Sequence, residues 1–454
     1  MILLVNPRAT KPKNRRFPLS VMALGAVLPE DVTWKILDGN LPDADLFAEA
    51  AAEIERRRGT ADPVSLVAMT VMPGPQLVAA VPIAKRLNER FPGIPIVWGG
   101  YFPTLYPDPC LRAPYVDWIV RGQGERTFLE LLDALAGNRL PASVAGLGWK
   151  EDRTPRINPE RRWEGPDAFP DPSYGRIDVE TYLHPTAIGQ RSAVHQASIG
   201  CPYTCNFCGV IAAFGSLEKV ASPAKTQNAL SYLVKVHGVD AVHFYDNNFF
   251  LKEAHAEDLC GRLAPLGLRW WCEARIDVML RFSDRTWETI RRSGCAMVYF
   301  GAESGSDSTL AKMSKNLTTE QTLALARKTR EFGIVPEFSF MFGDPDDPAG
   351  EAEKTLAFVR KLKAVNPAMK LITYFYTPTP QRRGTYGNVD PLAGTPETLE
   401  EWTSPEWVGW MTHESPRVPW LTPELKARIA TFAVGLEAAP AADPEAYGHL
   451  RVSP

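Results

Sequence analysis

The chain has 454 residues, 45% of them hydrophobic, and this length supports two or three domains with separate cores. Its formal net charge of −3 excludes a general electrostatic attraction to nucleic acid or to an anionic membrane. No apolar run approaches the roughly 20 residues of a membrane-spanning helix. The cysteine count of seven is odd and disfavours a disulfide framework. We therefore expect a cytoplasmic protein without a membrane span and without a nucleic-acid partner.

Residues 1–145 alternate between short apolar runs and amphipathic helical patterns. The apolar runs predict buried parallel strands at Ile2–Val5, Thr33–Leu37, Ser65–Met69, Pro95–Trp98 and Trp118–Val120. Helices are predicted over Leu19–Leu28, Asp43–Arg58, Gln76–Arg90 and Glu125–Ala136. This order indicates an α/β domain with a doubly wound, flavodoxin-like sheet, in which ligands bind beyond the carboxyl ends of the strands.

The residues at those strand ends form the first candidate site. Glycines are frequent among them, and a glycine lets the backbone approach a bulky ligand closely. We expect a ligand to be bound by Asn6, Pro7, Thr70, Val71, Gly99, Gly100, Tyr101, Gly122, Gly124 and Glu125.

A second α/β region follows a connector. Residues 146–190 contain too many prolines and breaks in periodicity for a stable element, so we interpret them as a linker. Within residues 191–385, strands are predicted at His195–Ile199, Ala241–Tyr245, Leu268–Cys272, Met297–Phe300, Val335–Phe342 and Lys370–Tyr376. Six such units fit a partial (β/α)6 TIM-like barrel with its site where the strands end. Residues 386–454 form a carboxyl-terminal extension with four tryptophans, which we expect to pack mainly on the barrel.

Three cysteines, Cys201, Cys205 and Cys208, directly follow the first strand of this second region. Thiolates at this spacing can bind three irons of a four-iron cluster, and no fourth cysteine follows at cluster spacing, so one iron is open to a non-protein ligand. The alternatives are a zinc site completed by a distant histidine and a disulfide.

The cysteine spacing, with an aromatic residue before the last cysteine, resembles the signature of the radical SAM superfamily. The resemblance extends over about residues 190–385 and implies a [4Fe-4S] cluster whose open iron binds S-adenosyl-L-methionine (SAM). An electron from the cluster then splits SAM to a 5′-deoxyadenosyl radical.

Later strand ends match family motifs that surround SAM. The resemblance implies that Asp246 accepts a hydrogen bond from the SAM amino group, that Arg275 binds the methionine carboxylate, and that Glu303 and Ser304 bind SAM polar groups. Phe342 and Gly343 would let adenine stack on the backbone. The alternatives are helix caps at Asp246 and Ser304 and an ion pair between Arg275 and Asp277.

Residues 1–145 resemble the cobalamin-binding domain that precedes many radical SAM domains. The family pattern Gly-Gly-x-His-Pro-Thr matches here with Phe102 in place of histidine, and Arg-Gly-Glu-Gly-Glu matches with Gln123 in place of its first glutamate. The domain contains no Asp-x-His-x-x-Gly motif, so we expect cobalt to have no protein imidazole ligand. A side chain introduced at Gly100 is expected to point into the corrin.

These resemblances predict a cobalamin-dependent radical SAM enzyme that methylates an unactivated carbon of a small-molecule or peptide substrate. An electron donor such as flavodoxin or ferredoxin would be its redox partner. One alternative keeps both cofactors but performs an oxidative cyclisation or rearrangement. Others are a radical SAM enzyme whose first domain no longer binds cobalamin and a non-enzymatic iron–sulfur or zinc module.

Overall fold

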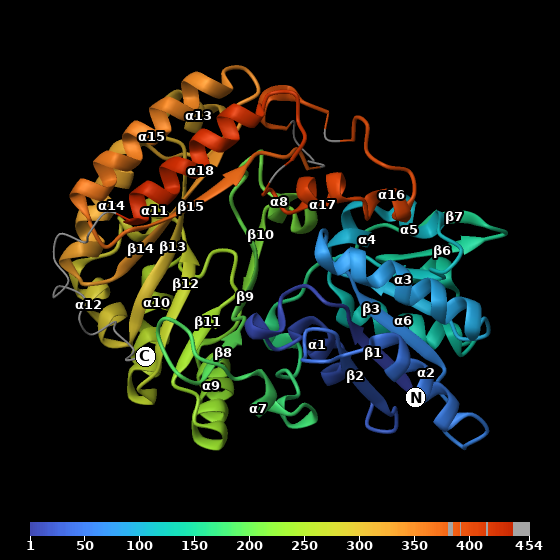
Figure 1. Ribbon diagram of the computed structural model, residues 1–454. Coiled ribbons are helices and arrows are strands. Elements are labelled where there is room, and N and C mark those ends of the chain that lie inside the picture. Colours follow the sequence, from blue (N-terminus) through green and yellow to red (C-terminus); the bar gives the residue numbers. More distant parts are fainter. Residues whose placement is uncertain (380–384, 391, 415, 439–454) are drawn as a thin grey trace. The chain divides into compact units, whose positions relative to one another are not determined.

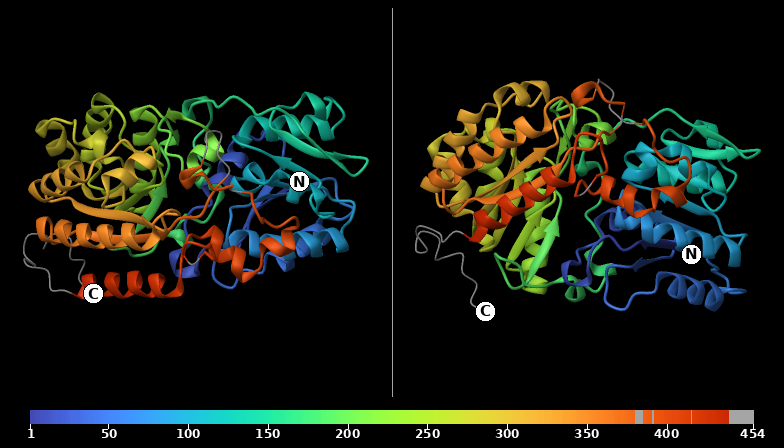
Figure 2. Two further views of the ribbon diagram at one scale, coloured as in Figure 1. Left: turned by 90° about the horizontal axis from the view of Figure 1, so that it is seen from above. Right: turned by 45° about the horizontal axis from the view of Figure 1, so that its top comes forward.

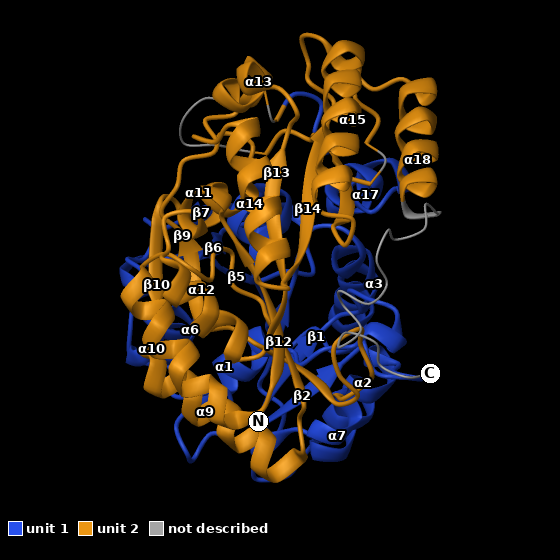
Figure 3. Ribbon diagram, turned by 90° about the vertical axis from the view of Figure 1, so that its left-hand side faces the viewer, with its two compact units in different colours: residues 1–182, 393–412 blue, residues 183–392, 413–454 orange. Residues whose placement is uncertain are grey.

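The structure is a computed structural model that describes residues 1–379, 385–390, 392–414 and 416–438 (Figure 1). The chain divides into two compact units (Figure 3). Unit 1 comprises residues 1–182 and 393–412, and unit 2 comprises the described parts of residues 183–392 and 413–438. We describe each unit by itself.

Unit 1 is built on a seven-stranded sheet with the order β2-β1-β3-β4-β5-β6-β7. The first five strands are parallel: β1 Ile2–Asn6, β2 Trp34–Asp38, β3 Leu66–Thr70, β4 Ile96–Gly99 and β5 Trp118–Val120. Each lies within a residue or two of its predicted position. The order 2-1-3-4-5 is that of a flavodoxin-like, doubly wound sheet, which confirms the predicted fold class.

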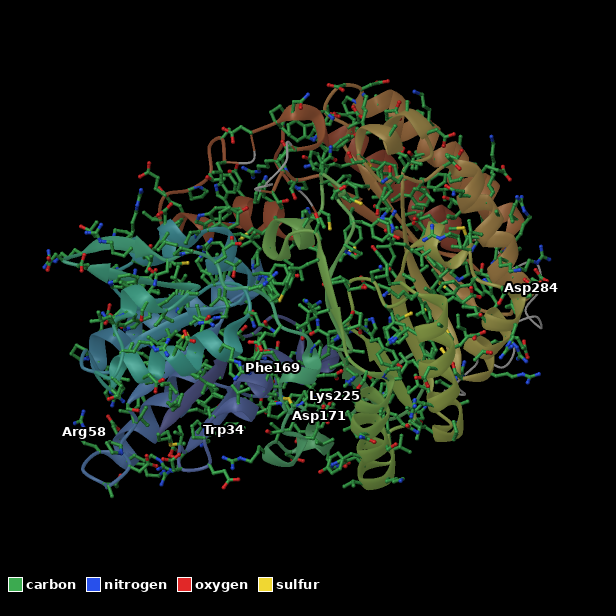
Figure 4. All side chains as sticks on the ribbon, turned by 180° about the vertical axis from the view of Figure 1, so that it is seen from behind. Trp34, Arg58, Phe169, Asp171, Lys225 and Asp284 are labelled. Carbon is green, nitrogen blue, oxygen red and sulfur yellow. The ribbon has the colours of Figure 1, made fainter. Side chains whose placement is uncertain are left out.

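The helices of unit 1 occupy the connections between these strands. They are α1 Leu19–Val27, α2 Leu46–Arg57, α3 Pro75–Arg90, α4 Tyr101–Leu105, α5 Pro107–Arg112, α6 Gly124–Leu135 and α7 Val179–Tyr182. Helix α1 packs against α6, and α2 packs against α3. Trp34 on β2, labelled in Figure 4, fills the space above Gly25 of α1, where a β-carbon would lie 2.6 Å from its ring.

The segment predicted to be a linker contains two strands of this sheet. β6 Leu147–Glu151 and β7 Thr154–Ile157 form an antiparallel hairpin that extends the sheet beyond β5. Asp152 and Arg153 make its turn with positive φ values of 49° and 65°. Two-residue hairpin turns of this kind usually contain glycine or asparagine, so the sequence carried no strong hairpin signal.

Unit 2 contains a parallel six-stranded sheet with the order β15-β14-β13-β12-β11-β8. The strands are β8 Ser192–His195, β11 Ala241–Phe244, β12 Arg269–Ala274, β13 Cys295–Glu303, β14 Val335–Phe342 and β15 Lys370–Phe375. Their sequential order fits the predicted partial barrel.

Helices cover this sheet between its strands. The longer ones are α9 Pro223–His237, α10 Glu253–Leu263, α12 Asp284–Arg292, α14 Thr319–Glu331, α15 Pro348–Val365 and α18 Pro423–Ala438, and the short ones are α8 Gly209–Phe214, α11 Ile276–Met279 and α13 Asp307–Lys312. Helix α18 lies beside α15 (Figure 2).

The prediction of one strand over His195–Ile199 was wrong. The chain leaves the sheet after β8, and β9 Ser198–Cys201 pairs instead with β10 Leu217–Val220 in an antiparallel ribbon. The break is fixed by Asp246, whose carboxylate accepts from the Ala197 N–H at 3.1 Å. The ribbon brings the first cysteine to the end of β9.

The tryptophans of the carboxyl-terminal extension divide between the units. Trp402 on α16 Leu399–Trp402 stacks edge-on with Phe102 of unit 1, and Trp407 and Trp410 on α17 Pro405–Met411 pack around Trp402. Trp420 packs on Tyr376 in unit 2. The expectation that these rings pack mainly on the barrel was wrong for the first three, because Phe102 and Tyr106 offer them an aromatic surface on unit 1.

Candidate functional site

The three cysteines lie between the last residue of β9, Cys201, and the residue before α8, Cys208, and none forms a disulfide. Burial and the charge of Cys205 raise the pKa of the Cys208 thiol to about 12, and burial likewise raises the pKa of Cys201. The Cys208 N–H donates to the Cys205 carbonyl at 3.3 Å, so these two cysteines lie on one tight turn. Coordination to iron removes the thiol protons and so relieves this cost.

The donor set fits an iron–sulfur cluster. Among the described residues, no three His, Cys, Asp or Glu side chains lie close enough together to bind a single metal ion. A four-iron cluster differs from such a site because each cysteine binds its own iron.

Arg275 ties this loop to the end of β12. Its Nη1 donates to the Cys205 Sγ at 3.5 Å, its Nη2 donates to the Lys315 carbonyl at 2.7 Å, and its Nε donates to Asp277 at 2.9 Å. The guanidinium also lies over the Tyr203 ring at 3.6 Å. The predicted ion pair with Asp277 is therefore present, together with a contact to the cysteine loop that the sequence did not indicate.

Glu303 forms a buried ion pair with Lys315. The Lys315 Nζ lies 2.7 Å from the Glu303 Oε1, and the two side chains are only 10% and 9% exposed. Burial opposes the charge of Lys315, but Glu303 and Cys205 together raise its pKa. Glu303 has a φ of 63°, a strained backbone conformation of the kind that clusters at functional sites.

Sequence reasoning missed Lys315. It follows helix α13 in a polar run, Lys312-Met-Ser-Lys315-Asn, that looks like an exposed loop. Only the fold shows that its ammonium group is buried beside Glu303 and near the Phe207 ring. No sequence pattern pointed to this position.

The other predicted SAM residues have local partners. Asp246 is buried and accepts from the Ala197 N–H, and burial raises the pKa of its carboxyl to about 7. The Ser304 hydroxyl accepts from the Ser306 N–H at 3.1 Å. Phe342 is buried at the end of β14, and Gly343 follows it beneath Leu421 of the carboxyl-terminal segment.

In unit 1, the predicted strand-end residues gather at the carboxyl edge of the sheet. Asn6, Thr70 and Gly99 are the last residues of β1, β3 and β4, with Pro7, Val71, Gly100 and Tyr101 directly after them. Gly122 and Gly124 follow β5, and Glu125 lies in the first turn of α6, where burial raises the pKa of its carboxyl.

A buried polar network supports this edge, and the sequence did not indicate its other members. Asn6 donates to Asp38 at 2.9 Å and accepts from Gln76 at 2.8 Å. The Tyr182 hydroxyl donates to the same Asp38 carboxylate at 2.9 Å. The Ser20 hydroxyl bonds that of Thr70 at 3.1 Å.

The structure gives Gly100 a role within the protein itself, and the expectation that a side chain here meets the corrin stays a prediction. A β-carbon there would lie 3.0 Å from the Val71 carbonyl oxygen and 3.2 Å from the Thr70 Oγ1, not in open space. Its φ of 97° also favours glycine. Gly100 is therefore required by the close approach of β3 and β4 at this edge.

Comparisons with known proteins identify both units. Residues 6–132 match the B12 binding domain family, and residues 196–359 match the radical SAM superfamily. The chain therefore belongs to the radical SAM superfamily, in the group with a preceding B12-binding domain, and its cofactors are a [4Fe-4S] cluster, SAM and cobalamin.

Two relatives and one solved structure illustrate the group. An uncharacterized methyltransferase of Pyrococcus horikoshii is 32% identical over 76% of this chain and 73% of its own length. The anaerobic magnesium-protoporphyrin IX monomethyl ester cyclase of Rubrivivax gelatinosus is 29% identical over 66% of this chain and 53% of its own. The structure of the radical S-adenosylmethionine methyltransferase TsrM from Kitasatospora setae superposes with a TM-score of 0.66 at 20% identity, covering 84% of this chain and 76% of TsrM. That likeness shows the fold.

None of the described helices combines the length and the apolar composition needed to span a membrane.

Proposed function

We propose that this chain transfers a methyl group to an unactivated carbon of a small-molecule or peptide substrate. The observation that carries the proposal is the polar cluster in which the three-cysteine loop, Arg275, Lys315 and Glu303 meet, in a chain that also has a B12-binding domain. When bound, the cofactors supply a 5′-deoxyadenosyl radical and a transferable methyl group.

In this proposal Cys201, Cys205 and Cys208 bind three irons of the cluster. Arg275 orients the loop through its bonds to Cys205 and to the Lys315 carbonyl. Its charge and that of Lys315 stabilise negative charge on the cysteine sulfurs.

The ion pair beside the loop matches the two charges of the methionine end of SAM. Glu303 can accept from an ammonium group, and Lys315 can donate to a carboxylate. We assign the carboxylate to Lys315 rather than to Arg275, because the Arg275 guanidinium already donates to Asp277, Cys205 and the backbone. Asp246, Ser304, Phe342 and Gly343 complete the proposed SAM site.

The carboxyl edge of the unit 1 sheet is the proposed cobalamin site. It includes Asn6, Pro7, Thr70, Val71, Gly99, Gly100, Tyr101, Gly122, Gly124 and Glu125. Phe102 is fully buried against Trp402, so this position offers no imidazole and no free side chain to cobalt. An electron donor such as flavodoxin or ferredoxin would reduce the cluster.

The names of the relatives support methylation and also a second candidate. The Pyrococcus relative, of which the chain covers 73%, is named a methyltransferase, whereas the chain covers 53% of the cyclase. An oxidative cyclisation with the same cofactors is the second candidate, favoured by the 29% identity to that cyclase.

The two reactions differ in product mass. Comparing the metabolites of a deletion strain with those of its parent would identify the substrate, which is then incubated with reconstituted enzyme and methyl-labelled SAM. Methylation predicts label on product carbon together with 5′-deoxyadenosine and S-adenosylhomocysteine. Formation of 5′-deoxyadenosine with an unlabelled product that has lost hydrogens would reject methylation and favour cyclisation. The Cys201→Ala variant is the control and should form neither product.

A further inference from the structure

One layer of side chains crosses the sheet of unit 2 on the face that carries Glu303. Glu273 of β12 pairs in register with Tyr299 of β13, and Tyr299 pairs with Glu337 of β14. Side chains alternate along a strand, so these three point to the same face. Their neighbours Cys272, Phe300 and Phe338 point to the opposite face, where they are completely buried. We call Glu273, Tyr299 and Glu337 the acidic layer.

The acidic layer has more negative than positive charge. Burial, Asp246 and Glu337 raise the pKa of the Glu273 carboxyl to about 7. Among the described residues no hydrogen bond or ion pair to the Glu273 side chain is present. Lys370 on β15 pairs in register with Glu337 and is exposed. Its charge lowers the pKa of Glu337, but burial raises this pKa by more, so the net shift is upward.

Two further polar side chains, Glu218 and Asn248, have no hydrogen-bond partner within the described chain, and Lys252 acts on Glu218 only electrostatically. Both carboxylate oxygens of Glu218 are shielded from solvent without a hydrogen bond, and Glu218 and Asp246 influence each other electrostatically. Asn248 is 1% exposed, and neither atom of its amide is bonded. It directly precedes Phe249, whose N–H donates to the Glu273 carbonyl at 2.8 Å. Buried polar groups without protein partners are rare in folded proteins, and these can bond a water molecule or a polar group of a ligand.

Aromatic rings complete the surroundings of the acidic layer. The His243 ring stacks on Trp271, two residues before Glu273, with ring centroids 3.9 Å apart. The Tyr299 hydroxyl lies near Ser339 of the adjacent β14 and near Tyr374 of β15. Aromatic faces and carboxylates both attract organic cations.

We propose that the substrate carries a protonated amine and that this amine binds between Glu273 and Glu337. The proposal rests on the proposed function in taking this face of unit 2 as the place where the substrate binds. Charge complementarity carries it: Glu273 has no ion-pair partner among the described residues, and Glu337 has only the exposed Lys370 beside it, so these two half-buried carboxylates favour a positively charged group over a neutral or anionic one. The layer lies one pleat before Gly301, Ser339 and the Glu303–Lys315 pair along the strands, so a bound amine would leave the proposed SAM site free.

The test compares amines with alcohols of the same shape. Holoenzyme reconstituted with its cluster and SAM, without reductant, is titrated calorimetrically at pH 8 with 2-phenylethylamine and 2-phenylethanol, tryptamine and tryptophol, and 1,5-diaminopentane and 1,5-pentanediol. We expect at least one amine to bind 10-fold or more tightly than its alcohol. The double variant Glu273→Gln/Glu337→Gln should lose this preference, whereas Glu331→Gln, an exposed position at the end of α14, should keep it.

The proposal is overturned if no amine binds more tightly than its alcohol, including the case in which nothing binds, or if the preference survives in the double variant. Cluster absorbance and SAM binding show whether the double variant is correctly folded. If the double variant does not bind the cluster, the amine and alcohol affinities of the unmodified enzyme alone decide whether the proposal holds. An amine preference without methyl label on the product would reject methylation and keep the amine site. If the enzyme shows no preference for amines but forms labelled product from a neutral substrate, the amine site is rejected and methylation is kept.

Discussion

The Glu303–Lys315 pair gives the sharpest test of the candidate site. Its two side chains are 9% and 10% exposed and their charged atoms lie 2.7 Å apart. Lys315→Met keeps most of the side-chain volume but leaves the Glu303 carboxylate buried without its partner. Breaking a buried pair on one side costs about 3–5 kcal/mol, because the remaining charge is uncompensated. This is a large part of the total stability of about 5–15 kcal/mol of a typical domain.

Hydrogen–deuterium exchange of peptides from β13 and α14 reports on unit 2 separately from unit 1. A loss of 3–5 kcal/mol corresponds to a fall in amide protection on the order of 10²–10³-fold or more, where exchange follows opening of the unit. Glu303→Gln alone should also destabilise unit 2, because it leaves the buried Lys315 ammonium without its counter-charge, although the amide oxygen can still accept a hydrogen bond from it. The double variant Lys315→Met/Glu303→Gln should be more stable than Lys315→Met alone, since it removes the isolated charge.

Arg327→Met is the matched control for this experiment. It breaks a pair with Glu320 on the surface of α14, where the two side chains are 55% and 73% exposed, and such a pair contributes about 0–1 kcal/mol. If Lys315→Met reduces protection no more than Arg327→Met does, the pair is not a buried ion pair and the reasoning about the site is refuted. Equal stability of the double variant and Lys315→Met would show that the two side chains are not coupled.

Three further predictions follow from the described residues. Replacing any of the three cluster cysteines by Ala should abolish cluster absorbance and 5′-deoxyadenosine formation, whereas Cys260→Ala should retain both; full cleavage of SAM by a triple variant would contradict this. Gly100→Val should destabilise unit 1, because the new side chain meets the Val71 carbonyl, and wild-type protection of β3 and β4 amides in the variant would argue against it. The stability of unit 2 should fall between pH 5 and pH 8: burial raises the pKa of Glu273 to about 7, so the folded state keeps a proton that the unfolded state loses above its pKa of about 4.3. Urea unfolding at several pH values measures this slope, and Glu273→Gln should reduce but not abolish it, because Asp246 and Glu337 also have raised pKa values; a slope unchanged in this variant would exclude the assignment.

The sequence was sufficient for features that depend on short stretches of chain. Parallel strands such as Ile2–Asn6 and Leu66–Thr70 appeared as largely apolar runs because a strand buried on both faces needs mainly apolar side chains. The cysteine loop was visible because its three cysteines lie within eight residues, and the resemblance of that spacing to the radical SAM signature implies the cluster.

Features that depend on the pairing of distant segments required the tertiary structure. The hairpin of β6 and β7 is fixed by pairing with β5, and its turn lacks the usual glycine. Residues 393–412 belong to unit 1, although the rest of that unit ends at residue 182. They pack there because Trp402 contacts the rings of Phe102 and Tyr106.

The same distinction applies to the candidate site. Lys315 has no periodicity or motif of its own, and its ammonium group is buried only because β13 ends beside it. Glu273, Tyr299 and Glu337 lie on three strands that are separate in the sequence, and only the register of those strands places them in one layer. The hydrophobic periodicity of a single helix or strand can be seen in the sequence, because it repeats within that element. Whether a charged side chain is buried depends on which elements pack together, and only the tertiary structure shows this packing.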